Sequence, residues 1–190
     1  MKQAFRAGLR IGLLAASVAG IASAQDIASN QKPEPPNKVV RAVPAVEPAD
    51  LSGMLAAQNQ VRERLGLSSL AWSADLADAS RATAADAAEG ACSMASTGRA
   101  VRGKDVSIYW AAGLRRLGGE DTAQDISPSY VVAQWRAGQS TFDAATSACR
   151  NSSPECAAYS RIVAPAHREV GCARHLCSTQ AQLWICEYGQ

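Results

Sequence analysis

The chain has 190 residues, which is enough for one ordinary domain with short extensions. Aromatic residues make up only 5% of it, and alanine supplies much of the apolar fraction, so packed helices are favoured over a large aromatic core. The formal net charge is +2, and the first 24 residues hold three basic residues and no acidic one, which leaves −1 for the rest. Such a chain lacks the basic excess that drives binding to nucleic acids or anionic membranes.

Residues 1–24 have the pattern of a signal peptide. Lys2, Arg6 and Arg10 precede an apolar run over 11–21, and Ala22-Ser23-Ala24 follows as a small-residue cleavage site. The run is too short to span a bilayer, although a retained anchor is the alternative, and we expect no transmembrane segment after cleavage. The sequence therefore predicts a secreted or periplasmic protein, and the alanine-rich leader is typical of bacteria.

All six cysteines follow the predicted signal peptide. An even number of cysteines in an exported chain predicts three disulfides. A metal site is the competing interpretation, because His175 and Cys177 place two possible ligands close together, but the spacings lack the paired pattern of zinc sites. The cysteines are Cys92, Cys149, Cys156, Cys172, Cys177 and Cys186.

The segment 25–49 carries five prolines and predicts an extended linker. A helix is then expected from Asp50 to about Leu65, where apolar residues fall on one stripe. Gln58 interrupts this stripe, so its amide should be hydrogen-bonded inside the domain or at a cleft. Ser73 is expected to cap a second helix that continues to about Glu89 and is stopped by Gly90.

The remaining chain changes from helical to strand patterns. A loop is expected over 92–103, a short helix over 106–117, and a further helix that begins at Ser127-Pro128 and ends near Gly138. The segments 159–163, 169–174 and 182–188 are rich in β-branched and aromatic residues and predict strands. Helices followed by strands predict an α+β domain over 50–190, with helices packed on a small antiparallel sheet.

Five segments, taken in order, carry a family resemblance. They are 58–62 with 70–73, Trp135 with Phe142-Asp143, Tyr159-Ser160-Arg161-Ile162-Val163, Arg168 to Ala173, and Trp184 to Tyr188. In this order and spacing they resemble the CAP superfamily, also called SCP/TAPS, of cysteine-rich secretory and plant pathogenesis-related proteins. The resemblance implies an α-β-α sandwich. By position it also implies that Cys172 pairs with Cys186 and Cys92 with Cys177, which leaves Cys149 for Cys156.

In many CAP proteins a central cleft holds two histidines and two glutamates that can bind a divalent cation. The corresponding positions here are Ser96, Lys104, Gly138 and Ala158, which supply neither an imidazole nor a carboxylate. A shift of one residue in the loop before Lys104 would put Asp105 in place of Lys104 without restoring a histidine. The resemblance thus implies a degenerate cleft, and we expect no bound metal and no cofactor.

The two histidines of the chain, His167 and His175, fall outside these motif positions. The favoured interpretation is that each lies in a surface turn. The alternative makes one of them a general base beside Glu169 or Glu187.

Three functions are compatible with this sequence. The first, which we favour, is a secreted non-catalytic CAP-like module that binds a protein, glycan or lipid ligand outside the cell or in its envelope. The second is a hydrolase whose active site lies off the family motif. The third is a structural, disulfide-stapled envelope domain. An enzyme is the less favoured reading, because no nucleophile motif is present.

Overall fold

The structure is a computed structural model, and it describes residues 45–89, 92–101 and 103–190. The predicted signal peptide and the greater part of the predicted linker lie outside the described residues, as does Gly90. The domain predicted over 50–190 falls almost entirely within them.

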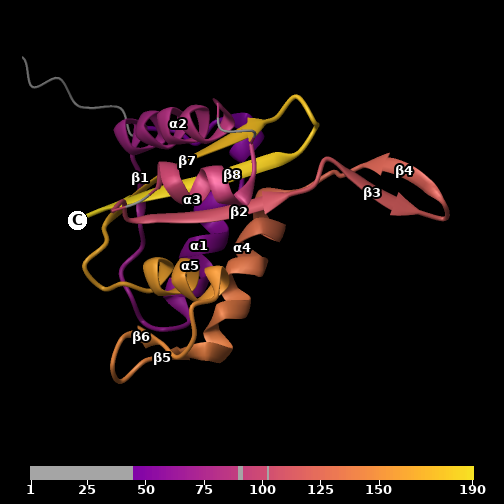
Figure 1. The fold of residues 1–190 in the computed structure, drawn as a ribbon. Coiled ribbons are helices and arrows are strands. Elements are labelled where there is room, and N and C mark those ends of the chain that lie inside the picture. The colour runs from indigo at the N-terminus through magenta and orange to yellow at the C-terminus, as the bar shows by residue number, and fades with distance from the viewer. Residues whose placement is uncertain (1–44, 90–91, 102) are drawn as a thin grey trace, which may run out of the picture. The chain divides into compact units, whose positions relative to one another are not determined.

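Helices cover both faces of a four-stranded sheet (Figure 1). The strand order is β1 (Ala71–Trp72), β7 (Glu169–Leu176), β8 (Gln182–Gly189) and β2 (Val106–Ala111). Strand β1 runs parallel to β7, and the other neighbours are antiparallel. One face is covered by α2 (Ala74–Glu89), with α3 (Met94–Ala100) beside it, and the opposite face by α1 (Met54–Glu63), α4 (Pro128–Arg136) and α5 (Pro154–Ile162). The α+β sandwich is therefore confirmed.

Short elements complete the domain. They are η1 (Ala49–Leu51), η2 (Ala137–Thr141), the pair β5 (Phe142–Asp143) and β6 (Ala148–Cys149), and the hairpin of β3 (Leu114–Leu117) and β4 (Glu120–Ala123). The hairpin extends away from the sheet and helices (Figure 1). Gly118 and Gly119 form its turn with φ values of 62° and 94°, which a glycine adopts without steric strain.

The alternation of side chains along β8 divides the core between the two faces of the sheet. Trp184 and Tyr188 pack with α1, α4 and α5, whereas Leu183 and Ile185 pack against the alanines of α2. Gly171 of β7 lies under α2, and a Cβ at this position would overlap the backbone of α2. The small residues of α2 therefore allow this helix to lie close to the sheet.

Two polar side chains of α1 are fully buried, namely Gln58 and Arg62. The Arg62 guanidinium donates hydrogen bonds to the carbonyl oxygens of Ser68, Ile162, Ala164 and His167, at 2.7, 2.7, 3.0 and 3.1 Å. Burial, with a smaller contribution from Arg168, lowers the pKa of Arg62. These bonds join the end of α1 to the segment before β1, to the last residue of α5 and to the segment that connects α5 with β7.

The helix caps predicted at Ser73 and Ser127 are present, since their hydroxyls accept from the backbone N–H groups of Leu76 and Tyr130. The first helix begins later than expected. Residues 49–51 form η1, and Gly53 then takes a left-handed φ of 92° before α1 starts at Met54.

Three other element predictions are wrong. The helix expected over 106–117 is strand β2 followed by β3, because alternate side chains of β2 pack on opposite faces of the sheet. The strand expected over 159–163 belongs to α5 and its end, which the Ser153 cap and Pro154 begin. The loop expected over 92–103 contains α3, which starts with a capping box between Ser93 and Ser96.

Three disulfides link distant parts of the domain. They join Cys92 to Cys177, Cys149 to Cys156 and Cys172 to Cys186, the same pairs that the resemblance implies. The first ties the segment between α2 and α3 to the end of β7, the second ties β6 to α5, and the third crosses between β7 and β8.

Candidate functional site

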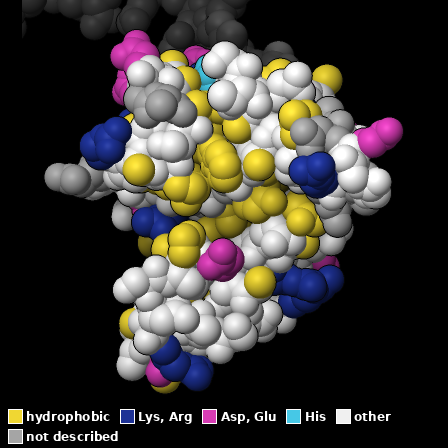
Figure 2. Space-filling view, turned by 45° about the vertical axis from the view of Figure 1, so that its right-hand side comes forward, with side chains coloured by type: hydrophobic (Ala, Val, Ile, Leu, Met, Phe, Trp, Pro, Cys, Tyr) yellow, Lys and Arg dark blue, Asp and Glu magenta, His cyan; other side chains and the backbone are white. Residues whose placement is uncertain are grey.

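A groove of about 210 Å³ lies between α3 and α5, along β2. Figure 2 shows hydrophobic side chains gathered in a hollow on this side of the molecule. Lys104 and Arg161 also line the groove. Its apolar lining consists of Met94, Val101, Val106, Ile108, Pro154, Ala157 and Ala158.

The structure brings only two of the four degenerate cleft positions to this groove, Lys104 and Ala158. Ser96 is buried in the first turn of α3, where its hydroxyl donates to the Ser93 carbonyl oxygen at 2.9 Å. Gly138 lies against α5, and a Cβ there would overlap the backbone of Glu155 and Cys156. At the four positions that the resemblance aligns with metal ligands, the structure therefore has a helix cap at Ser96, a tight helix contact at Gly138, and groove-lining residues at Lys104 and Ala158.

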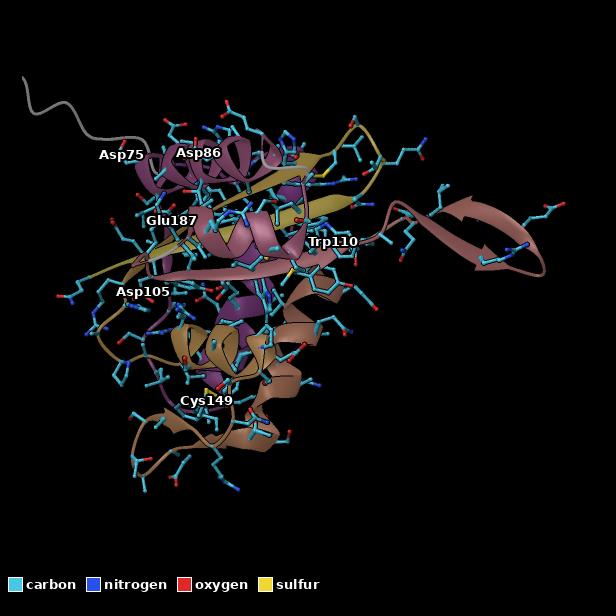
Figure 3. The ribbon with its side chains drawn as sticks, in the orientation of Figure 1. Asp75, Asp86, Asp105, Trp110, Cys149 and Glu187 are labelled. Carbon is cyan, nitrogen blue, oxygen red and sulfur yellow. A yellow bond between two sulfur atoms is a disulfide. The ribbon has the colours of Figure 1, made fainter. Side chains whose placement is uncertain are left out.

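Lys104 takes part in a polar cluster beneath the groove. Its ammonium group donates to the Thr83 hydroxyl and lies 3.7 Å from Oε1 of Glu187, which accepts from Thr83 at 2.7 Å. A hydroxyl beside an amine resembles a nucleophile and its base, but Thr83 is fully buried, so no substrate reaches it. The cluster links α2, β8 and the segment before β2, and Figure 3 labels Glu187.

A second cavity of about 230 Å³ has Asp105, Arg161 and His167 in its wall. The two carboxylate oxygens of Asp105 bind Nε of Arg161 and Nε2 of His167, each at 2.8 Å. His167 is only 7% exposed, so its prediction as a surface-turn residue is wrong. The alternative hypothesis places Glu169 or Glu187 beside a general-base histidine. For His167 this is also wrong, since the carboxylate beside it is that of Asp105.

The hydrogen bonds of His167 engage both of its ring nitrogens. Nε2 faces the Asp105 carboxylate, and Nδ1 lies 2.9 Å from the carbonyl oxygen of Arg161. A general base needs a nitrogen that is open to a substrate proton, and this ring offers none in the described geometry. The ring also stacks on Tyr188, with a centroid distance of 5.1 Å. His175, in contrast, is partly exposed but lies within strand β7 opposite Leu183, so the turn predicted for it is wrong.

A buried chain of hydrogen bonds runs behind the groove. The Tyr188 hydroxyl lies 2.9 Å from Oε1 of Gln58 and 3.1 Å from the Ser107 hydroxyl, which also lies 3.3 Å from the Ala158 carbonyl oxygen. Burial raises the pKa of Tyr188 above its ordinary value, so the phenol stays protonated at neutral pH. Gln58 is thus hydrogen-bonded inside the domain, as the interrupted stripe of α1 predicts.

Within the described ranges, no group of three or more His, Cys, Asp or Glu side chains is placed to hold a metal ion. In the same part of the chain, no helix combines the length and apolarity needed to cross a membrane.

Sequence reasoning missed most of the groove. Met94 and Val101 lie in a segment that was expected to be a loop, and Ile108 in one that was expected to be a helix. Two signals were available. Ser93 and Ser96 have the spacing of a capping box, and Val106, Ile108 and Trp110 alternate as β-branched and aromatic residues do in a strand.

Comparisons with known proteins agree with this architecture. Residues 55–188 match the family model described as the cysteine-rich secretory protein family, CAP. The hookworm platelet inhibitor is 13% identical with a TM-score of 0.55, and the alignment covers 76% of this chain and 71% of that one. Venom allergen-like protein 4 of Schistosoma mansoni is 14% identical with a TM-score of 0.50, covering 75% and 89%. A search of curated proteins gives no significant match.

At these identities the two structures support the fold alone, whereas the family model spans most of the chain. The order of the elements and the three disulfides agree with the family-model match over residues 55–188. The chain belongs to the cysteine-rich secretory protein (CAP) family.

Proposed function

We propose that this chain is a secreted, non-catalytic CAP module that binds an extracellular or envelope ligand through the groove between α3 and α5. The observation that carries this proposal is the apolar lining of the groove, which includes Lys104 and Ala158, two of the positions that the resemblance aligns with metal ligands. Concave apolar surface with a few charged groups at its margin is typical of binding sites. The signal-peptide pattern and the three disulfides support export to an oxidising compartment.

The lining also narrows the class of ligand. Seven of the nine lining residues are apolar, and the two charged ones are already partnered, Lys104 by Glu187 and Arg161 by Asp105. A glycan needs many hydrogen-bonding groups for its hydroxyls, and this groove offers few. The apolar walls therefore favour a protein or lipid ligand over a sugar.

If the groove is a binding site, it should bind an apolar probe, and a single substitution in its wall should abolish that binding. Ala157 is half-buried in the α5 wall, so Ala157→Arg should fill the groove with a charged side chain. We expect the uncharged apolar dye Nile red to bind the mature protein, and its affinity to fall at least about 10-fold in the variant, the equivalent of roughly 1.4 kcal/mol. Fluorescence titration measures both affinities.

The matched control is Ala137→Arg, which adds the same side chain at an exposed position of η2 outside the groove. It should bind the dye as the unsubstituted protein does. Thermal melting of both variants establishes that they are folded. If both variants are folded and bind the dye with equal affinity, the groove is not the binding site and the proposal is contradicted.

The cleft also predicts weak metal binding. Ser96, Lys104, Gly138 and Ala158 supply no imidazole and no carboxylate, and the Lys104 ammonium repels a cation. We expect no zinc binding at micromolar affinity and no hydrolysis that depends on zinc. Calorimetry on mature protein without an affinity tag measures the binding.

The contradictory outcome is one equivalent of zinc bound at micromolar affinity and lost in Asp105→Asn. That variant removes the one carboxylate that the sequence leaves as a substitute ligand near the cleft. Such a result would restore a metal site and, with it, the hydrolase hypothesis.

A further inference from the structure

Among the residues that the structure describes, β2 is the last strand of the sheet, so one of its edges has no neighbouring strand there. Its backbone groups alternate in direction, and two hydrogen bonds show which residues face outward. The N–H of Tyr188 in β8 donates to the Asp105 carbonyl oxygen, so Asp105, Ser107 and Tyr109 point their backbone groups toward β8. From the other side, the Trp135 indole donates to the Ile108 carbonyl oxygen at 2.8 Å.

It follows that Val106, Ile108 and Trp110 direct their N–H and C=O groups away from the sheet. Apart from the Ile108 carbonyl, no hydrogen bond from residues that the structure describes reaches these outward backbone groups. Figure 3 labels Asp105 and Trp110, which mark the two ends of this edge. An unpaired strand edge is a template for another extended chain.

This edge lies along the groove between α3 and α5. Val106 and Ile108 belong to the groove lining, with Met94 and Val101 on one side and α5 on the other. The two helices recess the edge, so a flexible strand reaches it whereas the edge of a second folded domain meets the helices first. A volume of about 210 Å³ is smaller than a typical small-molecule site of roughly 300–1,000 Å³, and it suits a few side chains.

We propose that the ligand of this groove is an extended peptide segment of a partner protein, which adds to the sheet as a strand beside β2. This proposal rests on the proposed function and specifies its ligand. Main-chain hydrogen bonds to the N–H and C=O of Val106 and to the N–H of Ile108 supply affinity, and alternate apolar side chains fit the two walls. Lys104 and Arg161 already have acidic partners, so the groove requires no charge on the peptide.

The test uses a peptide of about seven residues, long enough to span β2. It is selected from a random display library on the mature protein, counter-selected on Ala157→Arg, and then synthesised. Amide hydrogen exchange of the labelled protein is followed by NMR with and without this peptide. The readout compares Ile108, whose N–H faces the groove, with Tyr109, whose N–H faces β8.

In the free protein we expect Ile108 to exchange faster than Tyr109, and the peptide should slow Ile108 at least about 10-fold while Tyr109 changes little. N-methylation of those peptide residues that face β2 should weaken binding at least about 10-fold, whereas methylation of the residues between them should not. The second measurement needs no protein variant, so it stands even if Ala157→Arg misfolds.

Four outcomes overturn the inference. They are recovery of no peptide, a bound peptide that leaves Ile108 exchange unchanged, equal effects of methylation at all positions, and slow Ile108 exchange in the free protein. Slow Ile108 exchange that depends on protein concentration counts here too, because a second copy of the chain paired with β2 would protect this N–H. Any of these outcomes can occur while the dye still binds the mature protein and fails to bind Ala157→Arg. In that case the groove remains a binding site, and only the proposal of a peptide ligand fails.

Discussion

Replacing Arg62 by methionine is expected to lower the free energy of unfolding by about 4 kcal/mol, the largest effect of any single substitution proposed here. Methionine fills much of the same volume, so the expected loss comes from hydrogen bonds. Four carbonyl oxygens that now accept from the guanidinium would lose this donor, including those of Ile162 and His167, which lie in the interior. Chemical denaturation followed by circular dichroism measures the change.

Arg64→Met is the matched control, because the Arg64 side chain is exposed and makes no hydrogen bond or ion pair with the described residues. It should change stability by less than about 0.5 kcal/mol. If the two variants were equally stable, water or a neighbouring side chain would have to replace the Arg62 hydrogen bonds.

Removing the Cys92–Cys177 disulfide is expected to destabilise the domain by about 2 kcal/mol more than removing Cys149–Cys156. The first bond joins residues 85 apart in sequence and the second joins residues 7 apart. In the chain-entropy relation these closures stabilise by about 4.6 and 2.5 kcal/mol, because the longer loop restricts the unfolded chain more. Paired alanine substitutions leave no stranded thiol, and the difference corresponds to roughly 4–8 °C in melting temperature.

Both double variants retain the other two disulfides, so each serves as the control for the other. Equal melting temperatures would show that residual structure in the unfolded chain, and not loop length, determines the contribution of each bond.

The parts of the fold that the sequence predicted well are those with strong local signals. Ser127-Pro128 begins α4 through a cap and a favourable proline, and the last two strands carry dense β-branched and aromatic residues. Local signals failed where the composition of a segment is typical of a strand but the flanking residues start a helix. Residues 159–163 have strand-like composition, yet the cap at Ser153 starts a helix early enough to include most of them.

The candidate site was harder to predict, because its residues come from three elements that meet only in the folded domain. The resemblance identified Lys104 and Ala158 as altered positions, and both line the groove. It gave no indication that Asp105 lies between Arg161 and His167, since that contact joins residues 56 and 62 positions apart. Nor did the sequence show that the outer edge of β2 lies between two helices.

The close contact at Gly138 limits which substitutions could add a metal ligand to this domain. A glutamate at this position would need a Cβ where the backbone of Glu155 and Cys156 now lies, and the Cys149–Cys156 disulfide holds that turn of α5 in place. Replacing Gly138 by glutamate therefore cannot add a carboxylate at this point unless α5 itself moves. A cation site engineered into this domain would have to take its ligands from other positions, because the packing of η2 on α5 leaves no room for a side chain at position 138.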